Sequence, residues 1–227
     1  MKEPLIIINF KNYIEVASDK GLELARAAQK VAGDLGVEIV LAPPQPSLGL
    51  VLQDIHIPVI CQHVDNAGLG STTGYFSPEM AKSFGAIGSL INHSEHRLNI
   101  EMIESLVKRL HNLDMTSIVC AASSEEVARI ASFKPNFIAI EPPELIGSGK
   151  AVSKESPKII IDSIKSAAQN SKYTKLICGA GIVDQSDVRA ALQLGVEGIL
   201  VASGIIKSNS WYEKIIELGS AFTTTRL

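Results

Sequence analysis

A glutamate stands where a short apolar run gives way to a loop rich in proline and glycine. Residues 137–140 are apolar and are followed by Glu141 and two prolines, with Gly147 and Gly149 further along. A carboxylate at the end of a buried strand can act as a base, and proline at one end of a loop with glycine at the other predicts a lid with two hinges. The alternative is an exposed turn in which Glu141 is merely solvated.

Two other apolar runs end in clusters of polar side chains. The first ends in Asn9-Phe-Lys11, which could direct a cation and an amide at one oxygen of an anionic substrate. The fourth ends in Asn92-His-Ser-Glu-His-Arg97, where His93 could donate a hydrogen bond or move protons. We expect Ser94 and Glu95 to begin the next helix, as a cap and a charge partner. The simpler interpretations are a strand that ends in water and a capped helix start with His93 as filler.

Small residues follow the last two apolar runs. Cys178-Gly-Ala-Gly-Ile182 and Val201-Ala-Ser-Gly204 stand where loops after strands seven and eight of an eight-stranded barrel often bind phosphate through backbone N–H groups. Glycine also marks ordinary turns, so either loop alone indicates little. Two such loops in the expected places favour a phosphate site.

Two other kinds of site have less support. A metal pair of His93 and His96 lacks a third ligand at a suitable spacing. A glycosidase of this fold needs two carboxylates, and Glu95 with Glu141 would be the pair. The glycine loops and Lys11 would then have no role.

The elements that must position these residues alternate along the chain. Eight short β-branched runs occupy residues 5–8, 38–42, 59–62, 87–91, 117–121, 137–140, 176–179 and 198–201. Helical spacing occurs in 21–31, 100–113, 125–131, 157–168, 186–194 and 211–221, with weaker helices near 47–52 and 77–84. Apolar strands that alternate with helices predict a parallel sheet, and eight units in this length favour an α/β fold of the (β/α)8 barrel type over an open sheet.

Composition narrows the class of protein. The chain has 227 residues, 46% of them hydrophobic, and we expect a single barrel domain over residues 1–227. A net charge of −3 without a long basic cluster argues against nucleic acid or an anionic membrane as a partner, and no apolar stretch is long enough to cross a bilayer. Three cysteines far apart in apolar segments indicate reduced thiols in a cytosolic protein.

Four motifs, in their order along the chain, resemble triosephosphate isomerase. They are Asn9-Phe-Lys11, Asn92-His-Ser-Glu95, Ala139-Ile-Glu-Pro142 with Ile146-Gly-Ser-Gly149, and Leu200-Val-Ala-Ser-Gly204. The short chain, Pro143-Glu-Leu145 and Cys178-Gly-Ala-Gly181 are similar to the archaeal branch of that family.

The resemblance implies a reversible conversion of dihydroxyacetone phosphate to D-glyceraldehyde 3-phosphate, a step of glycolysis and gluconeogenesis, through an enediolate and without cofactor or metal. By position, Glu141 would be the base, His93 the electrophile and Lys11 the partner of the developing oxyanion. In the general account of this enzyme, the histidine is neutral because a helix N-terminus lowers its pKa. A lid over residues 142–150 would protect the enediolate from phosphate elimination. Ser94 and Glu95 would support a substrate site of Asn9, Lys11 and backbone near Ile146, Gly147, Gly181, Ala202 and Ser203.

The chain departs from the commoner family pattern in three places. Cys178 and Gly181 stand where a Tyr and a Ser usually latch the lid, so the latch must differ. Ala202-Ser203 replaces the usual Gly-Gly, and His96 replaces a common Arg. These positions lie outside the three predicted catalytic residues, so activity is still expected.

The loop 66–75 resembles the family's dimer loop. We expect a homodimer, with a tetramer also possible, in which Thr73 reaches the neighbour's active site. The alternative is a flexible, glycine-rich surface loop. For the function as a whole, the alternatives are another barrel enzyme that acts on a phosphorylated substrate, and a sensor that binds a phosphorylated ligand without catalysis.

Overall fold

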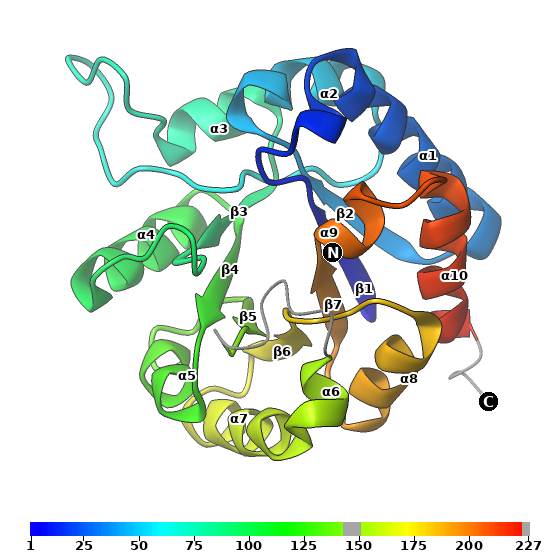
Figure 1. Ribbon diagram of the computed structural model, residues 1–227. Helices are drawn as coiled ribbons and strands as arrows, with labels where there is room; N and C mark the ends of the chain where they lie inside the picture. The colour runs from blue at the N-terminus through cyan, green and yellow to red at the C-terminus, as the bar shows by residue number, and fades with distance from the viewer. Residues whose placement is uncertain (143–150, 224–227) are drawn as a thin grey trace.

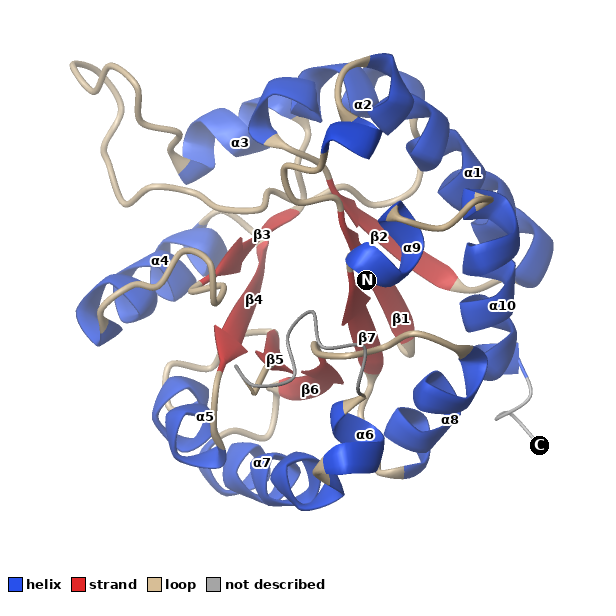
Figure 2. Cartoon of the chain, viewed as in Figure 1, coloured by secondary structure: helices blue, strands red, loops and turns tan. Residues whose placement is uncertain are grey.

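The computed structural model describes residues 1–142 and 151–223, and its strands form a ring inside a ring of helices (Figures 1 and 2). Seven parallel strands belong to one sheet in the order β2-β1-β7-β6-β5-β4-β3. Their bounds are β1 (Leu5–Asn9), β2 (Glu38–Ala42), β3 (Gly88–Ile91), β4 (Thr116–Ala121), β5 (Phe137–Ile140), β6 (Lys175–Cys178) and β7 (Gly198–Val201).

Residues 58–61 close the barrel between β2 and β3. The backbone N–H of Ile60 donates to Leu41 O at 2.8 Å, and the N–H of Cys61 donates to Gly88 O at 2.9 Å. Two parallel bridges, Leu41 with Val59 and Cys61 with Ser89, show that this segment takes the position of the eighth strand of the barrel. The predicted α/β (β/α)8 barrel is therefore confirmed, although the run at 59–62 pairs only through single bridges. Pro58, which has no N–H to donate, limits the ladder at the start of this segment.

The strands are buried on both faces, as continuous apolar runs require. Alternate residues fill the barrel interior: Leu5, Ile7, Val40, Ala42, Ile60, Leu90, Ile118, Cys120, Phe137, Ala139, Ile177 and Leu200. The intervening residues, such as Ile6 and Ile8 of β1, pack against the surrounding helices. This alternation fixes the register and therefore which residue stands at the end of each strand.

Ten α-helices occupy the described residues, with short 3₁₀ helices at Ile14–Val16 and Gln45–Ser47. The α-helices are α1 (Asp19–Leu35), α2 (Leu48–Asp54), α3 (Pro78–Phe84), α4 (Ile100–Asn112), α5 (Ser124–Ala131), α6 (Val152–Glu155), α7 (Pro157–Asn170), α8 (Gln185–Gln193), α9 (Ser203–Ile206) and α10 (Trp211–Thr223). All eight helices expected from spacing are present with small changes of bounds, and α6 and α9 were too short for the periodicity to predict. Side chains cap several N-termini, including Asn99 at α4 and Asp184 in a capping box at α8.

Candidate active site

A cavity of about 280 Å³ lies at the carboxyl ends of the strands and brings together most of the predicted site residues. It is lined by Asn9, Lys11, His93 and Glu141, by residues 179–183, and by residues 200–204 with Lys207. Both small-residue loops that were predicted to hold phosphate line this cavity, through Gly181 in one loop and Ala202 and Ser203 in the other. The geometry places a carboxylate, an imidazole and an ammonium around one small space.

Glu141 follows β5 directly and is 3% exposed. Neither of its carboxylate oxygens accepts a hydrogen bond from a described residue. Burial raises the pKa of Glu141 to about 7, because the charged form has lost its water, while the Cys120 thiol, the Lys11 ammonium and the Ser94 backbone act in the opposite direction. A carboxyl group with a pKa near neutrality, which no bond holds in place, is suited to exchange protons with a ligand.

His93 faces Glu141 across the cavity. The backbone N–H of Glu95 donates to His93 Nδ1 at 3.2 Å, which assigns the proton of the neutral ring to Nε2. His93 Nε2 lies 3.8 Å from Glu141 Oε2. Burial, with a smaller contribution from the nearby Lys11 charge, lowers the pKa of His93 to about 4. The imidazole is therefore neutral at physiological pH and presents a hydrogen-bond donor to the cavity.

The prediction that Ser94 and Glu95 begin a helix is wrong. Residues 94 and 95 form a turn in which the N–H of His96 donates to His93 O at 2.7 Å, and α4 starts at Ile100 with the Asn99 side chain as its cap. The Asn99 side chain accepts from the N–H of Met102 at 2.8 Å, so one of the free N–H groups of the first helical turn is satisfied there. The pKa of His93 accordingly falls through burial, and the turn supplies the N–H that a helix N-terminus would have provided.

Hydrogen bonds of the Asn92 side chain hold the loop that carries His93 in place. Asn92 has φ +61° and is 1% exposed, and its amide donates to Cys120 O at 2.9 Å and to Glu126 Oε1 at 3.2 Å. Its carbonyl oxygen accepts from the N–H of Leu98 at 2.9 Å, and Arg97 forms an ion pair with Glu126. These contacts hold the backbone on both sides of His93, so the imidazole has a set position before any ligand arrives.

Lys11 is held in a left-handed conformation, φ +47°, which is uncommon for a residue with a side chain. Its N–H donates to Asn9 Oδ1 at 2.9 Å, and its carbonyl accepts from Gln62 Nε2 at 3.2 Å. Lys11 Nζ lies 2.7 Å from Glu95 Oε1. Asn9 and Gln62 thus fix the backbone, and Glu95 fixes the ammonium beside His93.

The loop after β6 is tied to the segment that follows residue 150. Asp187 Oδ2 accepts from the N–H groups of Val183 and Asp184, at 2.9 Å and 3.1 Å, and Asp187 Oδ1 lies 2.6 Å from Lys154 Nζ. Ser153 Oγ also donates to Asp187 O at 3.2 Å. One buried carboxylate therefore connects α6, the start of α8 and the loop that lines the cavity.

Three predicted residues are not among those that line this cavity, and two more lie outside the described residues. Glu95 lines an adjoining cavity of about 700 Å³ together with His63, Phe76 and His96. Ser94 Oγ is buried and has no hydrogen-bond partner among the described residues. Thr73 is exposed. It belongs to the loop 66–75, which projects outward beside α3 (Figure 1). Ile146 and Gly147 lie outside the described residues, as does most of the predicted lid.

Three residues of the site escaped the sequence prediction. Gln62 fixes Lys11 from the end of the 59–62 run, Gly179 lies against Glu141, and Lys207 lines the cavity one turn beyond Ser203. The position of Lys207, one helical turn after Ser203, is the signal that could have identified it, because residues four apart lie on the same side of a helix. No signal in the sequence points to the contact between Gly179 and Glu141.

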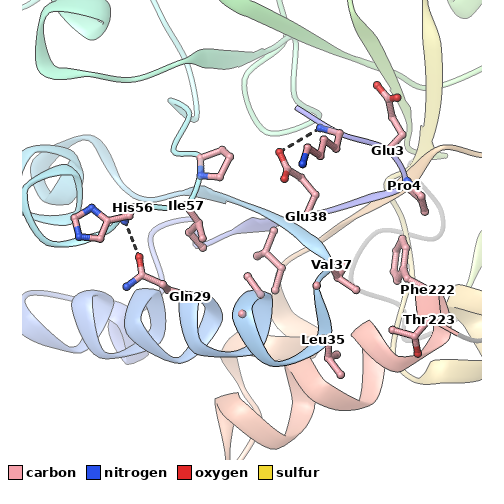
Figure 3. A pocket seen from close by; sticks show the side chains of 16 residues that line it. Glu3, Pro4, Gln29, Leu35, Val37, Glu38, His56, Ile57, Phe222 and Thr223 are labelled. Carbon is pink, nitrogen blue, oxygen red and sulfur yellow. Dashed lines mark hydrogen bonds between the residues drawn. The ribbon is translucent and has the colours of Figure 1, made fainter.

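A further cavity, about 650 Å³, lies at the opposite end of the barrel (Figure 3). It is lined by the residues that precede β1, by the ends of α1 and α10, and by residues 56–58. Its polar groups are already engaged: the N–H of Lys2 donates to Glu38 Oε1, and that of His56 to Gln29 Oε1. We assign no chemistry to this cavity, which is larger than the one that holds Glu141 but is lined by none of the predicted site residues.

The described residues provide neither a metal site nor a membrane-spanning helix. Within residues 1–142 and 151–223, no cluster of three or more His, Cys, Asp and Glu side chains is arranged to bind a metal ion. No helix in this part of the chain has the length and apolar character needed to cross a membrane.

Comparison with known proteins identifies similar sequences along nearly the whole chain. The family model described as Triosephosphate isomerase matches residues 4–219. The triosephosphate isomerase of Cenarchaeum symbiosum is 49% identical over 222 residues, which cover 98% of this chain and 99% of that protein. The triosephosphate isomerases of Sulfurisphaera tokodaii, 45% identical over 96% of this chain and 94% of the relative, and of Methanocaldococcus jannaschii, 42% identical over 94% and 98%, are also similar. The resemblance to archaeal sequences is confirmed.

Proposed function

This chain belongs to the triosephosphate isomerase family, and from that premise we propose that it interconverts dihydroxyacetone phosphate and D-glyceraldehyde 3-phosphate. The observation that carries the proposal is the pair formed by Glu141 and His93, whose Oε2 and Nε2 face the same cavity 3.8 Å apart. Isomerisation needs one group that moves a proton between adjacent carbons and another that stabilises charge on oxygen.

Glu141 moves the carbon-bound proton. The deprotonated carboxylate takes a proton from the CH₂OH carbon of dihydroxyacetone phosphate, which leaves an enediolate with its negative charge on oxygen. Glu141 then returns a proton to the neighbouring carbon, while the hydroxyl proton passes from one oxygen to the other. One C–H bond breaks and one forms, so the reaction balances without an external oxidant or reductant. Burial makes the carboxylate a stronger base than a solvated one, because its pKa is about 7.

His93 and Lys11 stabilise the oxygen side of the enediolate. The neutral imidazole donates from Nε2, because the Glu95 N–H already occupies Nδ1. Lys11, which is 2.7 Å from Glu95, supplies a positive charge whose position is fixed before the substrate binds. Asn9 holds the Lys11 backbone and lies 4% exposed beside it.

The small-residue loops hold the phosphate in this proposal. Gly181 has φ +72°, and residues 179–183 and 202–204 line the same cavity, so backbone N–H groups can approach a phosphoryl oxygen without obstruction by side chains. Ile146 and Gly147 would complete the site, and a lid over residues 142–150 would exclude water from the enediolate.

We also propose that the protein works as a homodimer in the cytoplasm, in glycolysis and gluconeogenesis, with residues 1–227 as one domain. Eight of the eleven large hydrophobic side chains exposed in the described residues lie between residues 14 and 102: Ile14, Leu50, Leu69, Tyr75, Met80, Phe84, Ile87 and Met102. Two of them, Leu69 and Tyr75, belong to the loop 66–75, and exposed apolar side chains on this loop support association through it. Thr73 of the projecting loop would then approach the partner's site, and light scattering of the purified protein, alone and with Leu69→Asp, would test the assembly.

A coupled assay tests the enzymatic proposal. Dihydroxyacetone phosphate is supplied, and a dehydrogenase that acts on the aldehyde product reports turnover. We expect activity in the parent protein and a loss of activity in Glu141→Gln, whose side chain has nearly the same shape but cannot accept the proton. A folded parent protein that fails to turn over the substrate would contradict the proposal.

A further inference from the structure

A lysine outside the predicted catalytic group lies at the rim of the cavity. Lys207 directly follows α9 and lines the cavity together with Lys11, Glu141 and residues 179–183. Its side chain is exposed, so its ammonium is hydrated and charged. Lys207 is therefore a cation on the side of the cavity that the small-residue loops form.

Tyr13 holds this lysine in place. Lys207 Nζ lies 5.1 Å from the centroid of the Tyr13 ring, within the range of a cation–π contact. Tyr13 precedes the short 3₁₀ helix at Ile14–Val16 and packs partly against the main core. The contact joins the loop after β1, which carries Lys11, to the loop after β7, and it keeps a long and flexible side chain close to the cavity.

The two cations of the cavity differ in how they are paired. Lys11 Nζ is 2.7 Å from a carboxylate oxygen of Glu95, so much of its charge is already balanced. Within the described residues, Lys207 has no carboxylate oxygen within 4 Å. An aromatic ring attracts a cation but leaves its net charge in place, so Lys207 can still respond to an anion.

The charge of the substrate favours such a group. A phosphate monoester carries about −1.5 to −2 at pH 7. The pair of Lys11 with Glu95 has no net charge, and deprotonated Glu141 adds a negative one. Backbone N–H groups of the small loops contribute dipoles but no net charge. Lys207 is therefore the cation of the cavity lining whose charge no described carboxylate balances within 4 Å.

We propose that Lys207 is a phosphate-binding residue of this site and that Tyr13 is its positioning residue. This inference rests on the proposed function, because it assigns the lysine to the phosphate of the same substrate. The charge-assisted contact stabilises substrate and transition state alike, so its loss weakens binding more than turnover. A rim cation also attracts the dianion from solution, an effect that salt screens.

The test compares Lys207→Met and Lys207→Arg with a control of equal charge change. Lys172→Met serves as the control because Lys172 is exposed just before β6, at the opposite end of the barrel. We expect Lys207→Met to raise KM for D-glyceraldehyde 3-phosphate and the inhibition constant of inorganic phosphate by about tenfold, with kcat within about threefold. Lys207→Arg should restore most of the affinity, and Lys172→Met should resemble the parent.

A substrate without phosphate distinguishes the loss of a phosphate contact from a general disturbance of the active site. For D-glyceraldehyde, kcat/KM should be the same in Lys207→Met as in the parent, because no phosphate is present to lose a contact. Tyr13→Leu should reproduce part of the loss with the phosphorylated substrate, and Tyr13→Phe, which retains the ring, should recover it. The dependence of kcat/KM on ionic strength should be weaker in Lys207→Met than in Lys172→Met.

Three outcomes would overturn the inference: an unchanged inhibition constant of phosphate in Lys207→Met, an equal loss with D-glyceraldehyde, or an equal loss in Lys172→Met. Failure of the proposed function gives a different result, namely no turnover of dihydroxyacetone phosphate by the parent. In that case, calorimetric titration of the parent and Lys207→Met with inorganic phosphate still tests the lysine, and equal affinities would contradict its role.

Discussion

Gly179 leaves the space that the side chain of Glu141 occupies. A Cβ built on Gly179 would lie 2.5 Å from Glu141 Cγ, closer than a Cβ approaches another atom in proteins, and 3.0 Å from its Oε1, which is tighter than most Cβ contacts. The contact follows from the strand register, because Ile140 pairs with Cys178 and the N–H of Gly179 donates to Ile140 O at 3.0 Å. The residue after β5 must therefore lie beside the residue after β6. Glycine at 179 permits the buried position of the carboxylate.

Gly179→Ala should displace Glu141 and reduce kcat by about 100-fold, as expected when a reacting group moves by roughly 1 Å. The inhibition constant of inorganic phosphate should change much less, because phosphate does not depend on this carboxylate. Gly33→Ala is a matched control: Gly33 lies in α1, and a Cβ there meets nothing within 4 Å. The control should keep its activity and gain about 0.5 to 1 kcal/mol in free energy of unfolding. Parent-like kcat in Gly179→Ala would contradict the steric argument.

Glu141→Asp should lower kcat by about 100-fold or more, since shortening the side chain by one methylene withdraws the base from the carbon. Phosphate affinity should stay near the parent value, because the small-residue loops are untouched. Steady-state kinetics and inhibition by inorganic phosphate measure the two effects separately. Unchanged turnover would remove Glu141 from the role of base.

The activity should depend on pH through Glu141. Because the pKa of Glu141 is about 7 and only the deprotonated form is a base, kcat/KM should rise with pH and reach half its maximum near pH 7. His93, with a pKa of about 4, stays neutral over this range and adds no second transition. The substrate phosphate also titrates near pH 6, so the profile should be repeated with D-glyceraldehyde. A half-maximum near pH 4.5 with that substrate would show that the pKa of Glu141 is not raised.

Stability should depend on pH in the opposite sense. The folded protein holds the Glu141 proton more tightly than the unfolded chain does, because the pKa is about 7 in one and about 4.5 in the other. The contribution of this group to the free energy of unfolding is therefore fully present below about pH 4.5, and up to about 3 kcal/mol is lost as pH rises to about 7. Glu141→Gln has no proton to release at this position, so its free energy of unfolding does not decrease for this reason as pH rises. Urea denaturation of both proteins at pH 4.5 and pH 8 should show the variant gaining relative to the parent; a constant difference would contradict the linkage.

Lys11→Met should weaken both substrate binding and turnover, because the ammonium interacts with the substrate and with the developing oxyanion. It should also move the half-maximum of the pH profile upward, since the Lys11 charge opposes the rise in the pKa of Glu141 that burial causes. Met keeps much of the apolar stem, so the fold should tolerate the change. A variant that remained as active as the parent would rule out the electrostatic role of Lys11.

The barrel and most of its site were predictable from local patterns. Apolar runs mark the strands, and the C-terminal ends of barrel strands share one face, so Asn9, His93 and Glu141 were expected to meet there. The helix at Ser94 was predicted wrongly because a Ser-x-x-polar pattern can form either a cap or a turn. The actual start, at Asn99, satisfies the helix N–H groups equally well.

The sequence by itself determined the order of the elements and the residue type at each strand end, because both follow from periods of two and of about 3.6 residues along the chain. The tertiary structure decided what those residues contact and what pKa values they have. Lys11 pairs with Glu95 from 84 positions away, Gly179 makes room for Glu141, and α9 brings Lys207 to the cavity. The pKa values near 7 and 4 arise from loss of water around Glu141 and His93. Desolvation depends on every neighbour in space, so no local pattern in the sequence could have supplied it.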